Sequence, residues 1–191
     1  PTTVDLQERF EAGKEVENRI KRELTALGFN LVASGLAMSK FSRMEQYGIH
    51  GKLDTVIRYK DKNVLIEIKS MHPMVWKRIN TLGDMEKDVF MRKYIRQMQI
   101  YLLAFELDQG LFIMDDCMNH WKMIPIYLDF DYAEAILKVV EKANGHLPSW
   151  NNGAEGTLPD RIEYGEECQK CPFAFICLPE VSNNGAQFIN S

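Results

Sequence analysis

The spacing of apolar residues near the start of the chain predicts an amphipathic helix over about residues 5–27. One face of this helix carries residues at alternating steps of four and three, namely Leu6, Phe10, Gly13, Glu17, Ile20, Leu24 and Leu27. Gly28 follows as a stop signal. The stripe therefore contains one carboxylate, that of Glu17, among apolar neighbours. Residues 31–47 show no clear period.

Alternation of apolar and polar residues then predicts β-strands. Residues 49–59 and 64–69 alternate on either side of the polar turn 60–63, so these two segments are expected to form a hairpin. Residues 111–114 and 123–128 are expected to form a second hairpin after Gly110.

Two further helices complete the pattern. The first covers about residues 88–107, with one side formed by Tyr94, Gln97, Tyr101 and Ala104. The second covers residues 131–144, with Asp129 or Asp131 as its N-cap. Residues 71–87 are expected to be irregular. The order of elements predicts an α/β fold with a central sheet flanked by helices.

Length and composition favour one domain with a substantial core. The chain has 191 residues, 46% of them hydrophobic, and its four cysteines are too few to replace a core. We expect a single domain over 1–191, with the core in 1–150 and a C-terminal loop bearing a cysteine cluster in 151–191. No apolar run approaches the roughly 18 residues of a membrane span, and the charged N-terminal segment is unlike a signal peptide. A cytoplasmic location is therefore expected, without membrane association.

The net charge of −4 is unevenly distributed along the chain. Residues 1–100 carry 18 Lys and Arg against 13 Asp and Glu, whereas residues 101–191 carry 5 against 14. Such asymmetry is a hint that one face binds a polyanion, although the total charge argues against a general nucleic-acid coat.

Candidate chemistry lies on the first hairpin. Glu67 and Lys69 share one face of their strand, because alternate residues of a strand point the same way. Asp54 on the preceding strand is expected to join them. Two carboxylates with an ammonium group suit a divalent metal and a phosphate ester, whereas the same residues on an exposed strand are ordinary surface.

Two other features support a site. Glu17 is a carboxylate on an apolar stripe, which is costly unless the group is paired, binds a metal or reaches water. Gln97 and Tyr101 are four residues apart on a helix and so lie side by side, either to orient a phosphate or as ordinary helix residues.

Taken in order, the sequences Gly13-x-x-x-Glu17, Gly51-x-x-Asp54, Glu67-x-Lys69 and Gln97-x-x-x-Tyr101 resemble the motifs of the PD-(D/E)XK nucleases, in their RecB-like branch. That branch includes the RecB and AddB nuclease domains, phage exonucleases and the CRISPR-associated RecB-like exonucleases. The resemblance covers roughly residues 10–180. It implies a restriction-endonuclease-like core with a mixed sheet.

The resemblance also implies roles for individual residues. Asp54, Glu67 and the Ile68 carbonyl would bind Mg²⁺ or Mn²⁺, and Lys69 would be the catalytic lysine. Gln97 and Tyr101 would lie near the active site and DNA. Many members have His where this chain has Glu17, and a carboxylate there would add an oxygen ligand, which leaves the choice between one and two metal ions open.

Three cysteines lie close together near the end of the chain, as Cys168-x2-Cys171-x5-Cys177. This spacing, followed by Pro and Phe after the second Cys, resembles RecB-like nucleases that hold a [4Fe–4S] cluster. Such a cluster usually needs four thiolates, and this chain has no cysteine before Cys117. Cys117 could be the fourth ligand, His120 or His146 could complete a zinc site, or the fourth ligand could lie upstream of this sequence. The thiols could also simply pack as small apolar groups. Of the two metals, iron–sulfur is favoured over zinc.

Basic and aromatic residues alternate between positions 71 and 96, a mixture that suits single-stranded nucleic acid. The candidate DNA-binding residues are Trp76, Lys77, Arg78, Arg92, Lys93 and Arg96. Trp76 is the candidate stacking residue.

These observations predict a metal-dependent DNA nuclease in a prokaryotic or phage-infected cell, acting as an exonuclease on single strands or DNA ends. The alternative is a nuclease-fold protein that binds DNA or a partner without cutting, within a recombination or CRISPR-adaptation complex. No phosphate-binding GxxxxGK[ST] sequence is present, so any helicase activity would come from a partner. A helicase, a recombinase or a CRISPR-adaptation protein is the kind of partner expected. The oligomeric state is left open.

Overall fold

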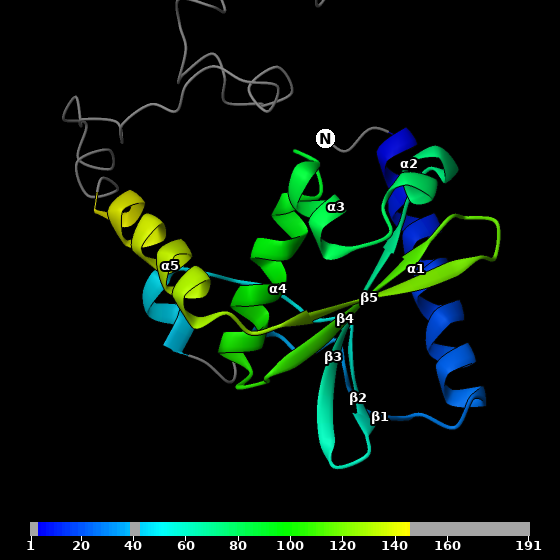
Figure 1. Ribbon diagram of the computed structural model, residues 1–191, viewed down its shortest axis with the longest axis horizontal. Coiled ribbons are helices and arrows are strands. Elements are labelled where there is room, and N and C mark those ends of the chain that lie inside the picture. Colours follow the sequence, from blue (N-terminus) through cyan, green and yellow to red (C-terminus); the bar gives the residue numbers. More distant parts are fainter. Residues whose placement is uncertain (1–3, 39–42, 146–191) are drawn as a thin grey trace, which may run out of the picture. The chain divides into compact units, whose positions relative to one another are not determined.

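The computed structural model describes residues 4–38 and 43–145 (Figure 1). The chain divides into two compact units, residues 1–140 and 141–191, and the fold given below is that of the first unit. The helix α5 runs across this boundary.

Helices and strands are interspersed along the described part of the chain. The strands are β1 (Asn30–Ser34), β2 (Thr55–Tyr59), β3 (Lys62–Ser70), β4 (Gln109–Asp115) and β5 (Trp121–Tyr127). The helices are α1 (Val4–Ala26), α2 (Pro73–Arg78), α3 (Leu82–Lys87), α4 (Arg92–Ala104) and α5 (Phe130–Asn144), with a short 3₁₀ helix at Arg43–Tyr47. Among these helices, none has the length and apolar character that a membrane span needs.

The five strands form one mixed sheet in the order β1-β2-β3-β4-β5. Both expected hairpins are confirmed, since β2 pairs antiparallel with β3, and β4 with β5. The central pair, β3 and β4, is parallel, with Lys69 opposite Met114 and Ser70 opposite Asp115. A parallel pair needs a crossover connection, which α2, α3 and α4 supply. This α/β arrangement, a mixed sheet flanked by helices, is consistent with a restriction-endonuclease-like core.

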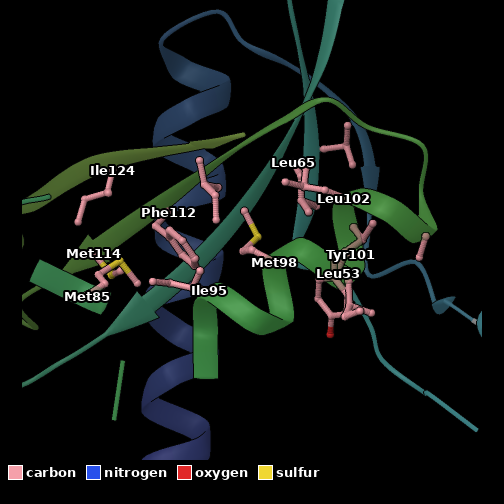
Figure 2. Close-up of a cluster of buried hydrophobic side chains, with 14 of the residues drawn as sticks. Leu53, Leu65, Met85, Ile95, Met98, Tyr101, Leu102, Phe112, Met114 and Ile124 are labelled. Atoms are coloured by element: carbon pink, nitrogen blue, oxygen red, sulfur yellow. The ribbon is translucent and has the colours of Figure 1, made fainter. Parts of the chain in front are cut away.

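Each face of the sheet has its own apolar cluster. On one face, Ile20 and Leu24 of α1 pack against Ile57, Ile66 and Ile68. Figure 2 shows the larger cluster on the other face, where residues of α4 lie against the sheet; it includes Leu65, Met98, Tyr101, Leu102 and Phe112. Because strand side chains alternate, Leu65 belongs to the α4 face and its neighbours Ile66 and Ile68 to the α1 face.

The stripe expected on α1 is only partly correct. Ile20 and Leu24 are buried, but Phe10 is 58% exposed and Leu27 is 65% exposed. The contacts of α1 with the sheet lie in the C-terminal half of the helix, at Val16, Ile20 and Leu24. The end of α1 follows the expected signal, because Gly28 has a φ of 88° and the N–H of Phe29 bonds the carbonyl of Leu24.

The expectation that residues 71–87 are irregular is wrong, because this segment contains α2 and α3. Pro73 occupies the first turn of α2, and the His72 side chain accepts a hydrogen bond from the N–H of Met74. Thr81 and Asp84 form a reciprocal capping box on α3. Helices of six residues are too short to show an apolar period, so their caps were the available signal.

Two other boundaries differ from expectation, and the N-cap of α5 is one of the two expected candidates. The first strand of the hairpin begins at Thr55 rather than at 49, and Lys52 makes only an isolated bridge to Ala37. The helix expected over 88–107 covers Arg92–Ala104, because the Asp88 side chain accepts from the N–H groups of Phe90 and Met91. Asp129 rather than Asp131 caps α5, accepting from the N–H of Tyr132.

Candidate functional site

Asp54 and Glu67 meet where β2 begins and β3 nears its end. Thr55 pairs with Ile66, so the same register places Asp54 opposite Glu67. Asp54 Oδ2 accepts a hydrogen bond from the N–H of Ile68 at 2.8 Å, which fixes the carboxylate across the hairpin. Burial raises the pKa of Asp54 despite this hydrogen bond, and the nearby charge of Glu17 adds to the effect.

Glu67 is the most unusual side chain of the site. It is 1% exposed, its Oε1 lies 2.6 Å from the Nζ of Lys69, and its Oε2 is buried without a hydrogen-bond partner in the described part of the chain. Burial raises the pKa of Glu67 to about 7, with a further contribution from the charge of Asp54. A buried carboxylate oxygen without a partner is costly, and a cation is one ligand that would satisfy it.

Lys69 lies between Glu67 and the helix α4. Burial by itself lowers the pKa of Lys69, but the charge and hydrogen bond of Glu67, together with Asp54, outweigh burial and raise it. The Nζ of Lys69 also lies 4.7 Å from the centre of the Tyr94 ring. The lysine is therefore held as an ammonium ion on the α4 side of the sheet.

Glu17 approaches the site from α1 but is already paired. Its carboxylate forms an ion pair with Lys21, whose Nζ donates to Ser34 Oγ at 2.8 Å. Ser34 Oγ in turn donates to the backbone carbonyl of Asp54 at 3.1 Å. Glu17 thus influences Asp54 through its charge and through this chain of contacts, and its expected role as a ligand stays a prediction.

Tyr101, which is hydrogen-bonded to Gln97, contacts the protein's own backbone. The Tyr101 hydroxyl donates to the carbonyl of Lys52 and accepts from the N–H of Lys52 and from Gln97 Nε2, at 3.2, 3.2 and 3.0 Å. Tyr101 is only 6% exposed. A Cβ added at Gly51 would lie 2.7 Å from the Tyr101 ring and hydroxyl. The pair therefore holds the segment that leads into Asp54, and Gly51 is the residue that leaves space for it.

The candidate DNA-binding residues fall into two groups. The first group lies on α2, where Trp76 Nε1 donates to the carbonyl of Met114 at 2.8 Å and the Nζ of Lys122 lies 4.0 Å from the centre of the Trp76 ring. In the same helix, Arg78 pairs with Asp88 at 2.7 Å. Lys77 is exposed. Trp76 is thus engaged in internal packing.

The second group lies on α4, which carries no acidic residue. Lys93 and Arg96 are exposed, and Arg92 has a buried Nε without a hydrogen-bond partner among the residues described. Arg92 lines a cavity of about 830 Å³ with Gln99, Tyr127 and Phe130.

Cys117 lies in the turn between β4 and β5, as expected. It is an exposed free thiol with a φ of 62°, and its N–H donates to Asp115 Oδ1 at 2.9 Å. His120, in the same turn, has its Nδ1 2.9 Å from Asp116 Oδ2. Cys168, Cys171, Cys177 and His146 lie outside the described residues.

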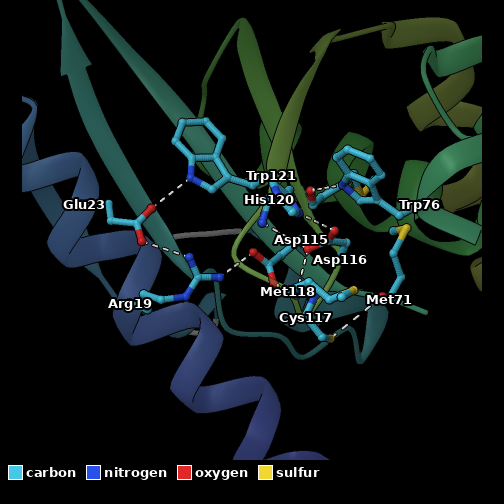
Figure 3. A network of polar contacts seen from close by, with 11 residues as sticks. Arg19, Glu23, Met71, Trp76, Asp115, Asp116, Cys117, Met118, His120 and Trp121 are labelled. Atoms are coloured by element: carbon cyan, nitrogen blue, oxygen red, sulfur yellow. Dashed lines mark hydrogen bonds and ion pairs between the residues drawn. The ribbon is translucent and has the colours of Figure 1, made fainter. Parts of the chain in front are cut away.

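The sequence did not single out a polar network on the α1 side (Figure 3). Arg19 pairs with Glu23 and with the fully buried Asp115, and Trp121 Nε1 donates to Glu23 Oε2 at 2.8 Å. Arg19 and Asp115 also line a cavity of about 620 Å³, together with Ser70, one residue beyond Lys69. One sequence signal for this network was available, because Arg19 and Glu23 flank the helix face that Val16, Ile20 and Leu24 form.

Tyr94 is the other residue whose role sequence reasoning missed. The sequence places Tyr94 on one side of the predicted helix with Gln97 and Tyr101, three and seven positions later, but only Gln97 and Tyr101 match a motif there. That spacing was the signal available.

In the part of the chain described, no three His, Cys, Asp or Glu side chains gather to form a complete metal cage. The site instead offers two carboxylates, Asp54 and Glu67. Mg²⁺ is commonly held by one or two carboxylates, with water and substrate phosphate completing its shell. The residues present fit such an ion.

Comparisons with known proteins identify no family. No protein-family model matches the chain, and no curated protein matches it. Among solved structures, the chain is similar to that of SSO0001, with 18% identity, a TM-score of 0.47, and coverage of 87% of this chain and 68% of the other.

Proposed function

We propose that the protein is a divalent-metal-dependent deoxyribonuclease that hydrolyses phosphodiesters in single-stranded DNA or at DNA ends. The observation that carries the proposal is the buried Glu67 Oε2, which has no hydrogen-bond partner among the described residues although the other oxygen contacts Lys69. A carboxylate arranged in this way, beside Asp54, is suited to a cation and a phosphate ester.

Asp54 and Glu67 would hold Mg²⁺ or Mn²⁺ through their carboxylate oxygens. The chemistry that such an ion supplies when bound is activation of a water molecule and neutralisation of charge on the phosphate.

The chain's own residues would supply the remaining functions. The N–H of Ile68 holds Asp54 in place, and Lys69 keeps its proton at Nζ, so that the ammonium group donates to a phosphate oxygen as negative charge develops there. Tyr101 keeps the segment before Asp54 in register.

The test is incubation of end-labelled single- and double-stranded DNA with Mg²⁺, with Mn²⁺ or with EDTA. We expect cleavage that EDTA abolishes, and a loss of about a hundredfold or more in Lys69→Ala and Asp54→Ala proteins. Lys62→Ala is the matched control, because Lys62 is exposed at the other end of the same strand. Full activity in Lys69→Ala protein would contradict the mechanism.

The alternative of a non-cutting DNA-binding subunit is decided by the same experiment. DNA binding without cleavage under every metal condition would favour it and would point to a helicase, recombinase or CRISPR-adaptation partner. A [4Fe–4S] cluster on the C-terminal cysteines stays a separate prediction, checked by iron and zinc analysis of the purified protein.

A further inference from the structure

The ammonium group of Lys69 has two neighbours of different kinds. On its own strand, Glu67 Oε1 lies 2.6 Å away, and on α4 the centre of the Tyr94 ring lies 4.7 Å away. The face of an aromatic ring attracts a cation because of its quadrupole, and the attraction is larger where water is partly excluded. Lys69 is mostly buried, so the Tyr94 contact lies in such an environment.

The contacts of Lys69 with Glu67 and with Tyr94 should respond differently when a divalent cation binds at the site. Glu67 is also the carboxylate that the proposed function assigns to a divalent cation, so its attraction for Lys69 is then shared with a second positive charge. The Tyr94 ring is uncharged, and it offers the same contact whether or not Glu67 is engaged. A lysine side chain that is not held loses its position easily, because it regains rotamer entropy.

Tyr94 also contacts a second ammonium group, that of Lys93, at 5.0 Å. Lys93 is exposed, whereas Lys69 is largely buried in the site. The two lysines therefore provide an internal comparison, since one faces the candidate catalytic carboxylate and the other faces solvent.

We propose that Tyr94 is a positioning residue for the hydrolysis, whose ring keeps the Lys69 ammonium directed at the site. This inference rests on the proposed nuclease function. Tyr94 acts through Lys69 and need not touch the substrate, and its aromatic ring, rather than its hydroxyl, is the part that matters.

The first experiment measures the position of Lys69 without any turnover. In protein labelled with ¹³C at the lysine ε-carbons, the ε-methylene signal of Lys69, assigned by its disappearance in Lys69→Arg protein, is expected to show a ring-current shift. The shift should persist in Tyr94→Phe and vanish in Tyr94→Leu. An unchanged Lys69 signal in Tyr94→Leu protein would overturn the proposal.

The second experiment measures kcat and KM on labelled DNA. We expect kcat to fall about tenfold in Tyr94→Leu, with little change in KM, and Tyr94→Phe to restore most of the lost rate. Lys93→Gln should instead raise KM, because an exposed cation contributes to DNA attraction. Tyr59→Leu, at the exposed end of β2, is the matched control and should match the wild-type protein.

The possible outcomes distinguish the positioning role of Tyr94 from the proposed nuclease function. Equal losses of kcat in Tyr94→Phe and Tyr94→Leu would show that the ring is not what matters, and an unchanged kcat in Tyr94→Leu would remove the role altogether. If the wild-type protein cleaves no DNA, the nuclease proposal fails, while the nuclear magnetic resonance measurement still decides whether Tyr94 positions Lys69. Matching thermal denaturation of the variants excludes misfolding as the cause.

Discussion

Glu67 lowers the stability of the folded protein and is also the candidate metal ligand. Its carboxylate is buried beside a second carboxylate, and only one of its oxygens has a described partner. Ionising it in the folded protein is therefore unfavourable, which is what its raised pKa expresses. A buried carboxylate that costs stability is expected to have a function, and we propose that the function of Glu67 is to bind a cation.

The pKa of Glu67 makes a prediction about stability in EDTA. Because the folded-state pKa is raised from 4.5 to about 7, its contribution is fully present below the unfolded pKa and is lost as the pH rises through about 7. Relative to wild type, Glu67→Gln protein should therefore gain roughly 2–3 kcal/mol of unfolding free energy between about pH 5 and about pH 8.

Urea denaturation at the two pH values measures this difference. The exposed Glu86→Gln is the matched control and should follow wild type. Parallel pH dependences of wild type and Glu67→Gln would show that Glu67 does not titrate in this range.

At the level of elements, the loop before β2 is set by α4. Gly51 and Lys52 pack under Tyr101, whose hydroxyl bonds both backbone groups of Lys52. Sequence alone places Gly51 and Tyr101 fifty residues apart and gives no reason to connect them. The two motifs act as one structural unit that determines the position of Asp54, just before β2 begins.

This packing predicts that Gly51→Ala is destabilising. The added Cβ would lie 2.7 Å from the Tyr101 ring and 2.9 Å from the Met38 side chain, so the loop or the ring must move. We expect a loss of about 1–3 kcal/mol in unfolding free energy, together with reduced nuclease activity.

Gly13→Ala is the control for this substitution. Gly13 lies inside α1 with no atom within 4 Å of an added Cβ, so alanine there should stabilise by about 0.5–1 kcal/mol. Denaturant titrations of both variants test the pair of expectations. Unchanged stability in Gly51→Ala protein would mean that the loop moves away without cost.

Over the whole first unit, one polar network joins α1 to the β4–β5 hairpin (Figure 3). Asp115 is completely buried, pairs with Arg19 and accepts from the N–H of Cys117. Arg19 and Trp121 in turn both contact Glu23. This network holds the helix that carries Glu17 against the carboxyl ends of the central parallel strands.

We therefore expect Asp115→Ala to cost about 2–4 kcal/mol, because it leaves Arg19 and a backbone N–H without their buried partner. Hydrogen exchange should show the loss of protection concentrated in α1. Glu134→Ala removes an exposed pair with Lys138 and should cost less than about 0.5 kcal/mol. Equal effects of the two substitutions would show that the buried network contributes no more than a surface pair.

The sequence by itself determined most of the longer elements and the shared strand face of Glu67 and Lys69. Strand alternation is a property of the backbone, so it was enough to place Glu67 and Lys69 on one face and to pair β2 with β3. The glycine stop after α1 and the N-cap of α5 follow from equally local hydrogen bonding.

Only the tertiary structure decided how distant segments meet. The parallel pairing of β3 with β4, the contact of Tyr94 with Lys69 and the burial of Asp115 under Arg19 join residues far apart in the chain. These contacts depend on burial and shape, which no short window of sequence contains. The same reason explains why the contact of Trp76 with the end of β4 was not evident from the sequence, while its expected role in DNA binding stays a prediction.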